Sequence, residues 1–181
     1  MDGTLALQRF TTRYIPAEDR MRVAGDLPGG QQVVLWLSQR LWLHLLPSVF
    51  TWLEKRVGAL PATSVVAQVH QEVQQGFALE AARQGLQPQV PVVPSEGASA
   101  WLVDMLSVEH ASTHLCVVFQ KGGEGGQPLT LAALHLSAHQ WRQWLLIVHR
   151  LWQQAEWPAQ VWPAWWADAG ATQSSAGQVV H

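Results

Sequence analysis

The stretch that decides the fold is "LWLSQRLWLHLL" (residues 35–46), because a similar stretch, "LHLSAHQWRQWL", recurs at residues 134–145. Five of the twelve aligned positions are identical. In each copy, an apolar run too short for a helix ends at a serine, and apolar residues at helical spacing follow. A serine can cap a helix, because its hydroxyl accepts a hydrogen bond from a free N–H of the first turn. We therefore predict a strand that runs into a helix at Ser38 and again at Ser137.

Two further strand-like runs precede each copy. They are "LALQRFTTRYI" and "DRMRVAGD" in the first half, and "AWLVDMLSVEH" and "THLCVVFQ" in the second. The glycine-rich turns "LPGGQ" and "KGGEGGQ" then lead into the third strand, as in hairpins. Each half is therefore expected to be a β-β-β-α unit. We predict an α+β fold of two internally duplicated, mainly antiparallel units, related by pseudo-two-fold symmetry around a common core.

This pattern divides the chain into four parts. Residues 1–56 and 100–156 form the two units, and we expect these halves to make one compact domain. Residues 57–99 hold a connector helix and a stiff linker with three prolines. The helix is predicted from apolar residues at spacings of three and four, which are Val66, Val69, Val73, Phe77 and Ala81. Residues 157–181 are expected to be a tryptophan-rich segment and a disordered tail.

Composition excludes some classes of protein. The hydrophobic fraction of 48% is enough for a core, whereas the charged fraction of 13% is about half the usual share of roughly 25%. Such a low charge suggests that part of the surface is covered by something. The single cysteine rules out an internal disulfide, and the N-terminus lacks the pattern of a signal peptide, so we predict a cytoplasmic protein. Residues 33–53 are about long enough to span a bilayer, but Arg40, His44 and Pro47 lie within them, and no stable membrane insertion is expected.

Tryptophan is the least ordinary feature, with 11 residues in 181. Four lie close together near the C-terminus: Trp157, Trp162, Trp165 and Trp166. Three interpretations are open: the segment folds back into the core, it anchors a protein partner, or it inserts at a membrane surface. Tryptophan is enriched in interface hot spots, so these four are our candidate partner-binding residues.

Histidine is the next candidate for chemistry. His110 and His114 are four residues apart, and so are His135 and His139. Imidazoles can bind zinc, so these four are a candidate metal site, although such spacing suits one metal only when both residues share a helix face. Ordinary surface or half-buried histidines are the alternative, and we predict no cofactor. No specific catalytic motif is present, so we expect a protein that is not an enzyme; these histidines are the only candidates if it is one.

A second function class follows from the order of the elements, which resembles that of single-stranded nucleic-acid-binding proteins such as the Whirly and PUR-repeat families. The resemblance is one of element order only, and it implies a basic, aromatic surface for stacking bases. The candidate residues are Arg9, Arg13, Arg20, Arg22 and Tyr14. The net charge of −2 argues against binding by bulk electrostatics, though not against a local basic face.

Low charge, abundant tryptophan, the doubled unit and the lack of a catalytic constellation favour a protein that binds other proteins. We therefore predict a non-enzymatic protein-interaction module, an adaptor or an accessory subunit of a larger assembly. In the simplest version it forms a homodimer through its apolar helices or its tryptophan segment.

Overall fold

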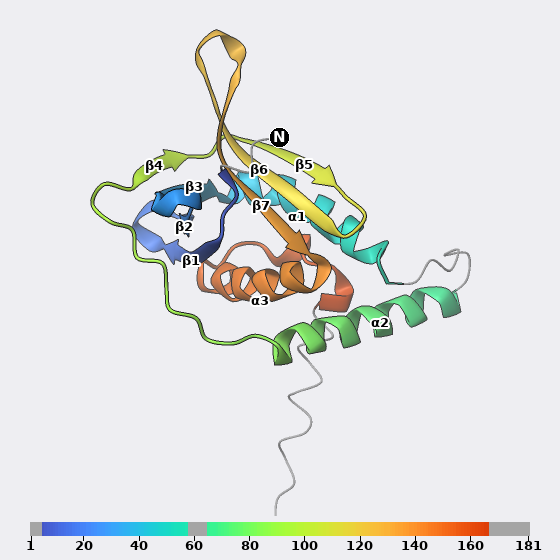
Figure 1. Ribbon diagram of the computed structural model, residues 1–181. Coiled ribbons are helices and arrows are strands. Elements are labelled where there is room, and N and C mark those ends of the chain that lie inside the picture. The colour runs from blue at the N-terminus through green and yellow to red at the C-terminus, as the bar shows by residue number, and fades with distance from the viewer. Residues whose placement is uncertain (1–4, 58–64, 167–181) are drawn as a thin grey trace, which may run out of the picture.

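The computed structural model describes residues 5–57 and 65–166, which form an α+β fold with two β-sheets (Figure 1). The first sheet has the strand order β1-β2-β3-β4 and the second has the order β5-β6-β7. The strands are β1 (Arg9–Ile15), β2 (Arg20–Asp26), β3 (Gln32–Ser38), β4 (Ser99–Leu102), β5 (Met105–His110), β6 (His114–Gly122) and β7 (Pro128–Ser137). The α-helices are α1 (Gln39–Glu54), α2 (Val65–Gln84) and α3 (Ala138–Gln154). The disordered tail expected at the C-terminus lies outside the described residues.

The expected hairpins are present, and every named strand pair is antiparallel except β3 with β4. The turn before β3 contains Gly29 and Gly30, and the turn before β7 contains Gly125 and Gly126. All four glycines have a φ between 73° and 81°, which side chains with a Cβ rarely adopt. The two glycine-rich stretches are therefore turns for a conformational reason.

The predicted strand over residues 100–110 is divided into β4 and β5. Val103 N–H donates to the Trp36 carbonyl of the first sheet at 3.0 Å, and Asp104 N–H donates to the Gln120 carbonyl of the second at 3.2 Å. The chain thus leaves one sheet and enters the other between these two residues. A second link lies before β1, where Leu7 N–H donates to the Ala133 carbonyl of β7 at 2.8 Å.

The two helices that follow β3 and β7 begin where the serines predict. Leu41 N–H donates to Ser38 Oγ, and Gln140 N–H donates to Ser137 Oγ, both at 3.3 Å. Each helix packs on its own unit's third strand and also on the first strand of the other unit: α1 contacts β5 and α3 contacts β1. Both sheets and both helices therefore enclose a single hydrophobic core, whose largest fully buried side chains are Trp42, Trp141, Trp152 and Phe119.

The stretch that was long enough to span a bilayer is divided between β3 and α1. In the part of the chain that the structure describes, no helix is long and apolar enough to cross a membrane.

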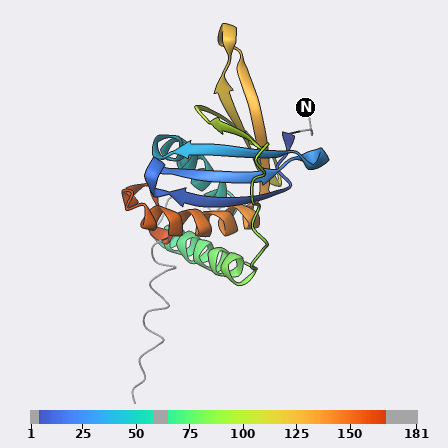
Figure 2. The same ribbon diagram turned by 90° about the vertical axis from the view of Figure 1, so that its left-hand side faces the viewer.

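The connector forms an outer layer. Helix α2 packs on α3, on the side of α3 away from the sheets (Figures 1 and 2). The linker then crosses the outer face of the first sheet, meaning the face turned away from α3 (Figure 2). Val92 N–H donates to Thr11 Oγ1, and Ser95 N–H donates to Gln32 Oε1, both at 2.8 Å.

Candidate functional site

The tryptophan segment folds back onto the molecule. Trp157, Trp165 and Trp166 are buried and Trp162 is partly buried, and all four belong to or pack against the hydrophobic core. Two indoles also donate hydrogen bonds to carboxylates, from Trp157 Nε1 to Asp19 at 2.8 Å and from Trp165 Nε1 to Glu54 at 3.1 Å. The segment therefore occupies the core position, one of the three interpretations left open by the sequence, and three of its indoles present little surface to a partner.

One histidine packs against the tryptophan segment. The His149 ring on α3 lies with its centroid 4.5 Å from that of Trp162 and 5.8 Å from that of Trp166. Burial among these rings lowers the pKa of His149, because the imidazolium loses hydration there. The neutral imidazole is therefore the form favoured when His149 packs against Trp162 and Trp166.

The four candidate metal ligands are not gathered into one site. His110 and His114 flank a turn in which Ala111 N–H donates to the His114 carbonyl, while His135 lies on β7 and His139 on α3. Throughout residues 5–57 and 65–166, no group of three or more His, Cys, Asp or Glu side chains is arranged to hold a metal ion.

A cysteine and a histidine do meet on the second sheet. Cys116 Sγ lies 3.6 Å from His135 Nε2 across the β6–β7 pair, and Glu109 faces Cys116 from β5. Burial, with the nearby Glu109 charge, raises the pKa of the Cys116 thiol. A thiol with a raised pKa is a poor nucleophile, since the thiolate is the reactive form. This trio therefore lacks the electrostatics of an activated cysteine.

The four candidate arginines share one face of the first sheet. Register pairs Arg9 with Asp26 and Arg13 with Arg22, and the side chains of Arg9, Arg13, Arg20 and Arg22 point to the outer face. Tyr14 points to the opposite face, where its hydroxyl donates to Asp19 at 2.8 Å and its ring packs edge-on against Trp157. Tyr14 is therefore separated from the arginines with which the sequence grouped it.

Helix α2 presents its polar side to the molecule. Gln75 is fully buried, and its amide donates to the Leu53 carbonyl at the end of α1 at 3.1 Å. Its amide oxygen accepts a hydrogen bond from Arg142 Nη2 of α3 at 2.7 Å. Gln71 donates to the Glu54 carbonyl, and Gln143 of α3 donates to the Ala82 carbonyl. The apolar contribution of α2 to this contact comes from Leu79 and Ala82.

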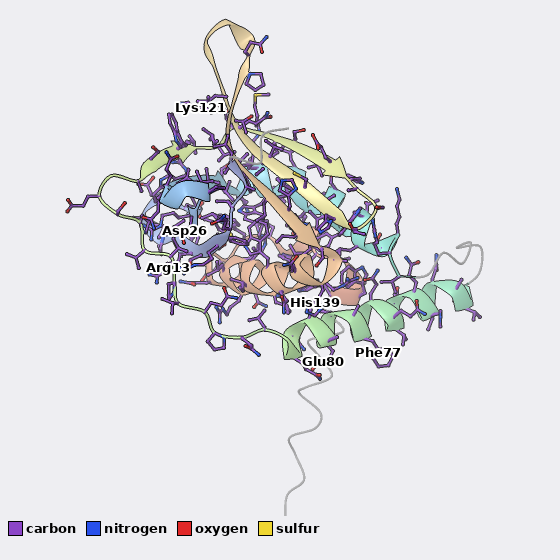
Figure 3. The ribbon with its side chains drawn as sticks, viewed as in Figure 1. Arg13, Asp26, Phe77, Glu80, Lys121 and His139 are labelled. Atoms are coloured by element: carbon purple, nitrogen blue, oxygen red, sulfur yellow. The ribbon has the colours of Figure 1, made fainter. Side chains whose placement is uncertain are left out.

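The opposite side of α2 is apolar and faces solvent. Phe77 is 73% exposed and Val66 is 77% exposed, and Figure 3 shows Phe77 pointing away from the body of the protein. We call this surface the α2 stripe, and its members are Val65, Val66, Val69, Val73 and Phe77. A surface helix normally turns its apolar stripe inward. The orientation of α2 is the reverse, so the α2 stripe is the candidate functional surface.

The sequence pattern grouped four members of the α2 stripe, Val66, Val69, Val73 and Phe77, but it indicated neither the orientation of this face nor the buried polar pair. Periodicity shows which residues share a helix face, whereas the direction of that face depends on the neighbouring elements. Gln75 and Arg142 carried no sequence signal of burial, because both residue types are mostly exposed in proteins.

Comparisons with protein-family models, with curated proteins and with solved structures find no match for this chain.

Proposed function

We propose that the protein is a non-enzymatic interaction module that associates with a second copy of itself through the α2 stripe, as an accessory subunit of a larger assembly. The observation that carries the proposal is the inverted orientation of α2. Five large apolar side chains are at least half exposed on one helix face, while the face toward the core is built around glutamines. Exposed apolar patches of this kind mark interaction sites.

The α2 stripe is suited to a copy of itself. If two α2 helices pack antiparallel about a two-fold axis near position 71, Val69 faces Val73 of the second copy and Phe77 faces Val65. Such a contact is self-complementary, as closed dimers require. Between Val65 and Phe77 the only acidic or basic side chain, histidine aside, is Glu72. Two copies therefore approach with little charge repulsion and little charged surface to dehydrate.

The helix is placed so that a second copy can reach it. In both ribbon views, α2 is the outermost layer, with α3 between it and the sheets (Figures 1 and 2). Its 20 residues give a length of about 30 Å at 1.5 Å per residue. Helices that cross at a shallow angle of about 20° stay in contact over several turns, as the pairing of Val65 with Phe77 requires. This geometry leaves the bodies of the two copies on opposite sides of the helix pair.

The test is sedimentation velocity over a wide concentration range. The wild-type chain is expected to shift from monomer to dimer, and Val69→Glu/Val73→Glu should keep it monomeric, because burying two carboxylates in an apolar contact is strongly unfavourable. Val90→Glu/Val93→Glu is the matched control, since both linker valines are more exposed than Val69 and Val73. A monomeric wild type, or a control that dissociates the dimer equally, would contradict the proposal.

We further propose that the chain arose by internal duplication, with pseudo-two-fold symmetry between the units. The supporting features are the shared order of three strands and a helix, the serine caps at Ser38 and Ser137, and the helices that each contact the other unit's first strand.

A further inference from the structure

The outer face of the first sheet carries a row of four side chains from four neighbouring strands. Register places Arg13 of β1 opposite Arg22 of β2, Arg22 opposite Trp36 of β3, and Trp36 beside Leu102 of β4. Neighbouring strands lie about 4.8 Å apart. The row therefore presents two guanidiniums, an indole and an isobutyl group in sequence across about 15 Å of sheet.

The charge of this row is uncompensated. Like charges directly opposite one another on antiparallel strands destabilise a sheet. Arg9 and Arg20 have carboxylate partners, Asp26 at 3.4 Å and Glu18 at 3.5 Å. Among the described residues, no carboxylate forms an ion pair with Arg13 or Arg22. The two opposed arginines are therefore not neutralised by any ion pair within the described chain.

The linker covers one part of this face, and the row lies in the part that remains open to solvent. The linker crosses the sheet at Thr11 and Gln32, and Val34 is buried although it points to the outer face. Figure 2 shows this crossing near the β2–β3 turn, with the other end of the face uncovered. Beyond the crossing, Trp36 is partly exposed and Leu102 is 45% exposed.

We propose that this row binds single-stranded nucleic acid, with Arg13 and Arg22 contacting phosphates and Trp36 stacking on a base. Arginine presents a planar fork of donors that matches phosphate oxygens. Aromatic side chains on a sheet face stack on unpaired bases, and this contact tolerates any sequence. A double helix keeps its bases stacked internally, and an acidic peptide offers carboxylates but no flat ring for the indole. Single strands match both chemistries of the row.

The proposal is independent of the α2 stripe, which lies on a different side of the molecule (Figure 2). It also differs from the site expected from sequence, because Trp36 takes the place of Tyr14. Arg13 is labelled on the sheet in Figure 3.

The experiment measures the fluorescence anisotropy of a labelled oligothymidylate of about 20 nucleotides, longer than the site of one compact single-strand-binding fold. The full chain should bind it at low salt. Arg13→Gln/Arg22→Gln should weaken binding at least about tenfold and reduce the salt slope by about 0.7 for each lost phosphate contact. Trp36→Leu should weaken binding by about tenfold and leave the salt slope unchanged.

The matched control is Arg40→Gln/Arg150→Gln, which removes two exposed arginines from α1 and α3 and changes the net charge equally. It should retain wild-type affinity. The Arg13→Gln/Arg22→Gln chain should melt at a temperature no lower than that of the wild type, because the change relieves a like-charge pair. The proposal is overturned by absence of binding at low salt, by an equal loss in the control, by tighter binding to duplex, or by competition from polyglutamate as effective as that from the unlabelled oligonucleotide.

Discussion

At the scale of single residues, the contact between α2 and the rest of the fold depends on a buried guanidinium. Arg142 is 4% exposed, and desolvation lowers the pKa of its side chain to about 10, so it remains charged at neutral pH. Its hydrogen bonds go to Gln75 Oε1 at 2.7 Å and to the Ala138 carbonyl at 3.3 Å, while Nε has no partner within the described chain. The charge is therefore held by neutral acceptors, of which Gln75 is the closer.

This arrangement predicts a strong coupling between the two side chains. Gln75→Leu should reduce the free energy of unfolding by about 3 kcal/mol, because it leaves a buried charge without its best acceptor. Gln75→Leu/Arg142→Leu should recover most of that loss, since a buried polar pair replaced by apolar residues of similar volume is often close to neutral. Urea unfolding of Gln75→Leu, Arg142→Leu and the double variant measures the coupling energy in a double-mutant cycle. Additive effects would mean that the hydrogen bond is not what stabilises this contact.

Residues also show where sequence reasoning was sufficient. Ser38 and Ser137 could be identified as helix caps because a cap is a local signal, carried by one residue and the pattern beside it. The division of β4 from β5 could not be predicted, because it depends on hydrogen bonds from Val103 to Trp36 and from Asp104 to Gln120. Those partners are distant in the chain, and nothing in the local sequence indicates them.

At the scale of elements, the C-terminal segment closes over the α1–α3 pair. Trp162 and Trp166 pack on Phe50 of α1 and on His149 of α3. A cluster of tryptophans is equally compatible with a core and with an exposed anchor, since the same large apolar rings serve both roles. The sequence therefore left this element open, and the contacts of the folded chain decide its position.

The packing of His149 against the C-terminal segment predicts that the stability of the fold depends on pH. Because the pKa of His149 is lowered in the folded protein, the unfolded chain binds a proton more readily, and the free energy of unfolding falls as the pH drops below about 6.5 toward the lowered value. Urea unfolding followed by tryptophan fluorescence between about pH 7.5 and pH 5 measures this loss. His149→Phe keeps a ring against Trp162 but cannot titrate, so its pH dependence should be shallower. An unchanged profile in this variant would exclude His149 as the group responsible.

At the scale of the whole molecule, the two sheets and the two capped helices form one core, and α2 packs on its outside, contributing Leu79. The α+β class and the order of strands and helices, apart from the division of β4 from β5, could be predicted, because alternation, helical periodicity and glycine turns are properties of short segments. The surface that remains exposed could not be predicted, because it depends on how α2 packs on α3. The result is a folded body with an apolar helix face on its exterior, which is the basis for the proposed dimer.

The most direct test of that dimer is disulfide cross-linking through α2. Cys116, the sole cysteine, is replaced by alanine, and a Val69→Cys chain is mixed with a Val73→Cys chain under mild oxidation. In the antiparallel contact these positions face each other, so the mixture should form covalent dimers faster than either chain alone and faster than a Val90→Cys control of higher exposure. Cross-linking of the mixture at the rate of the Val90→Cys control would contradict the account.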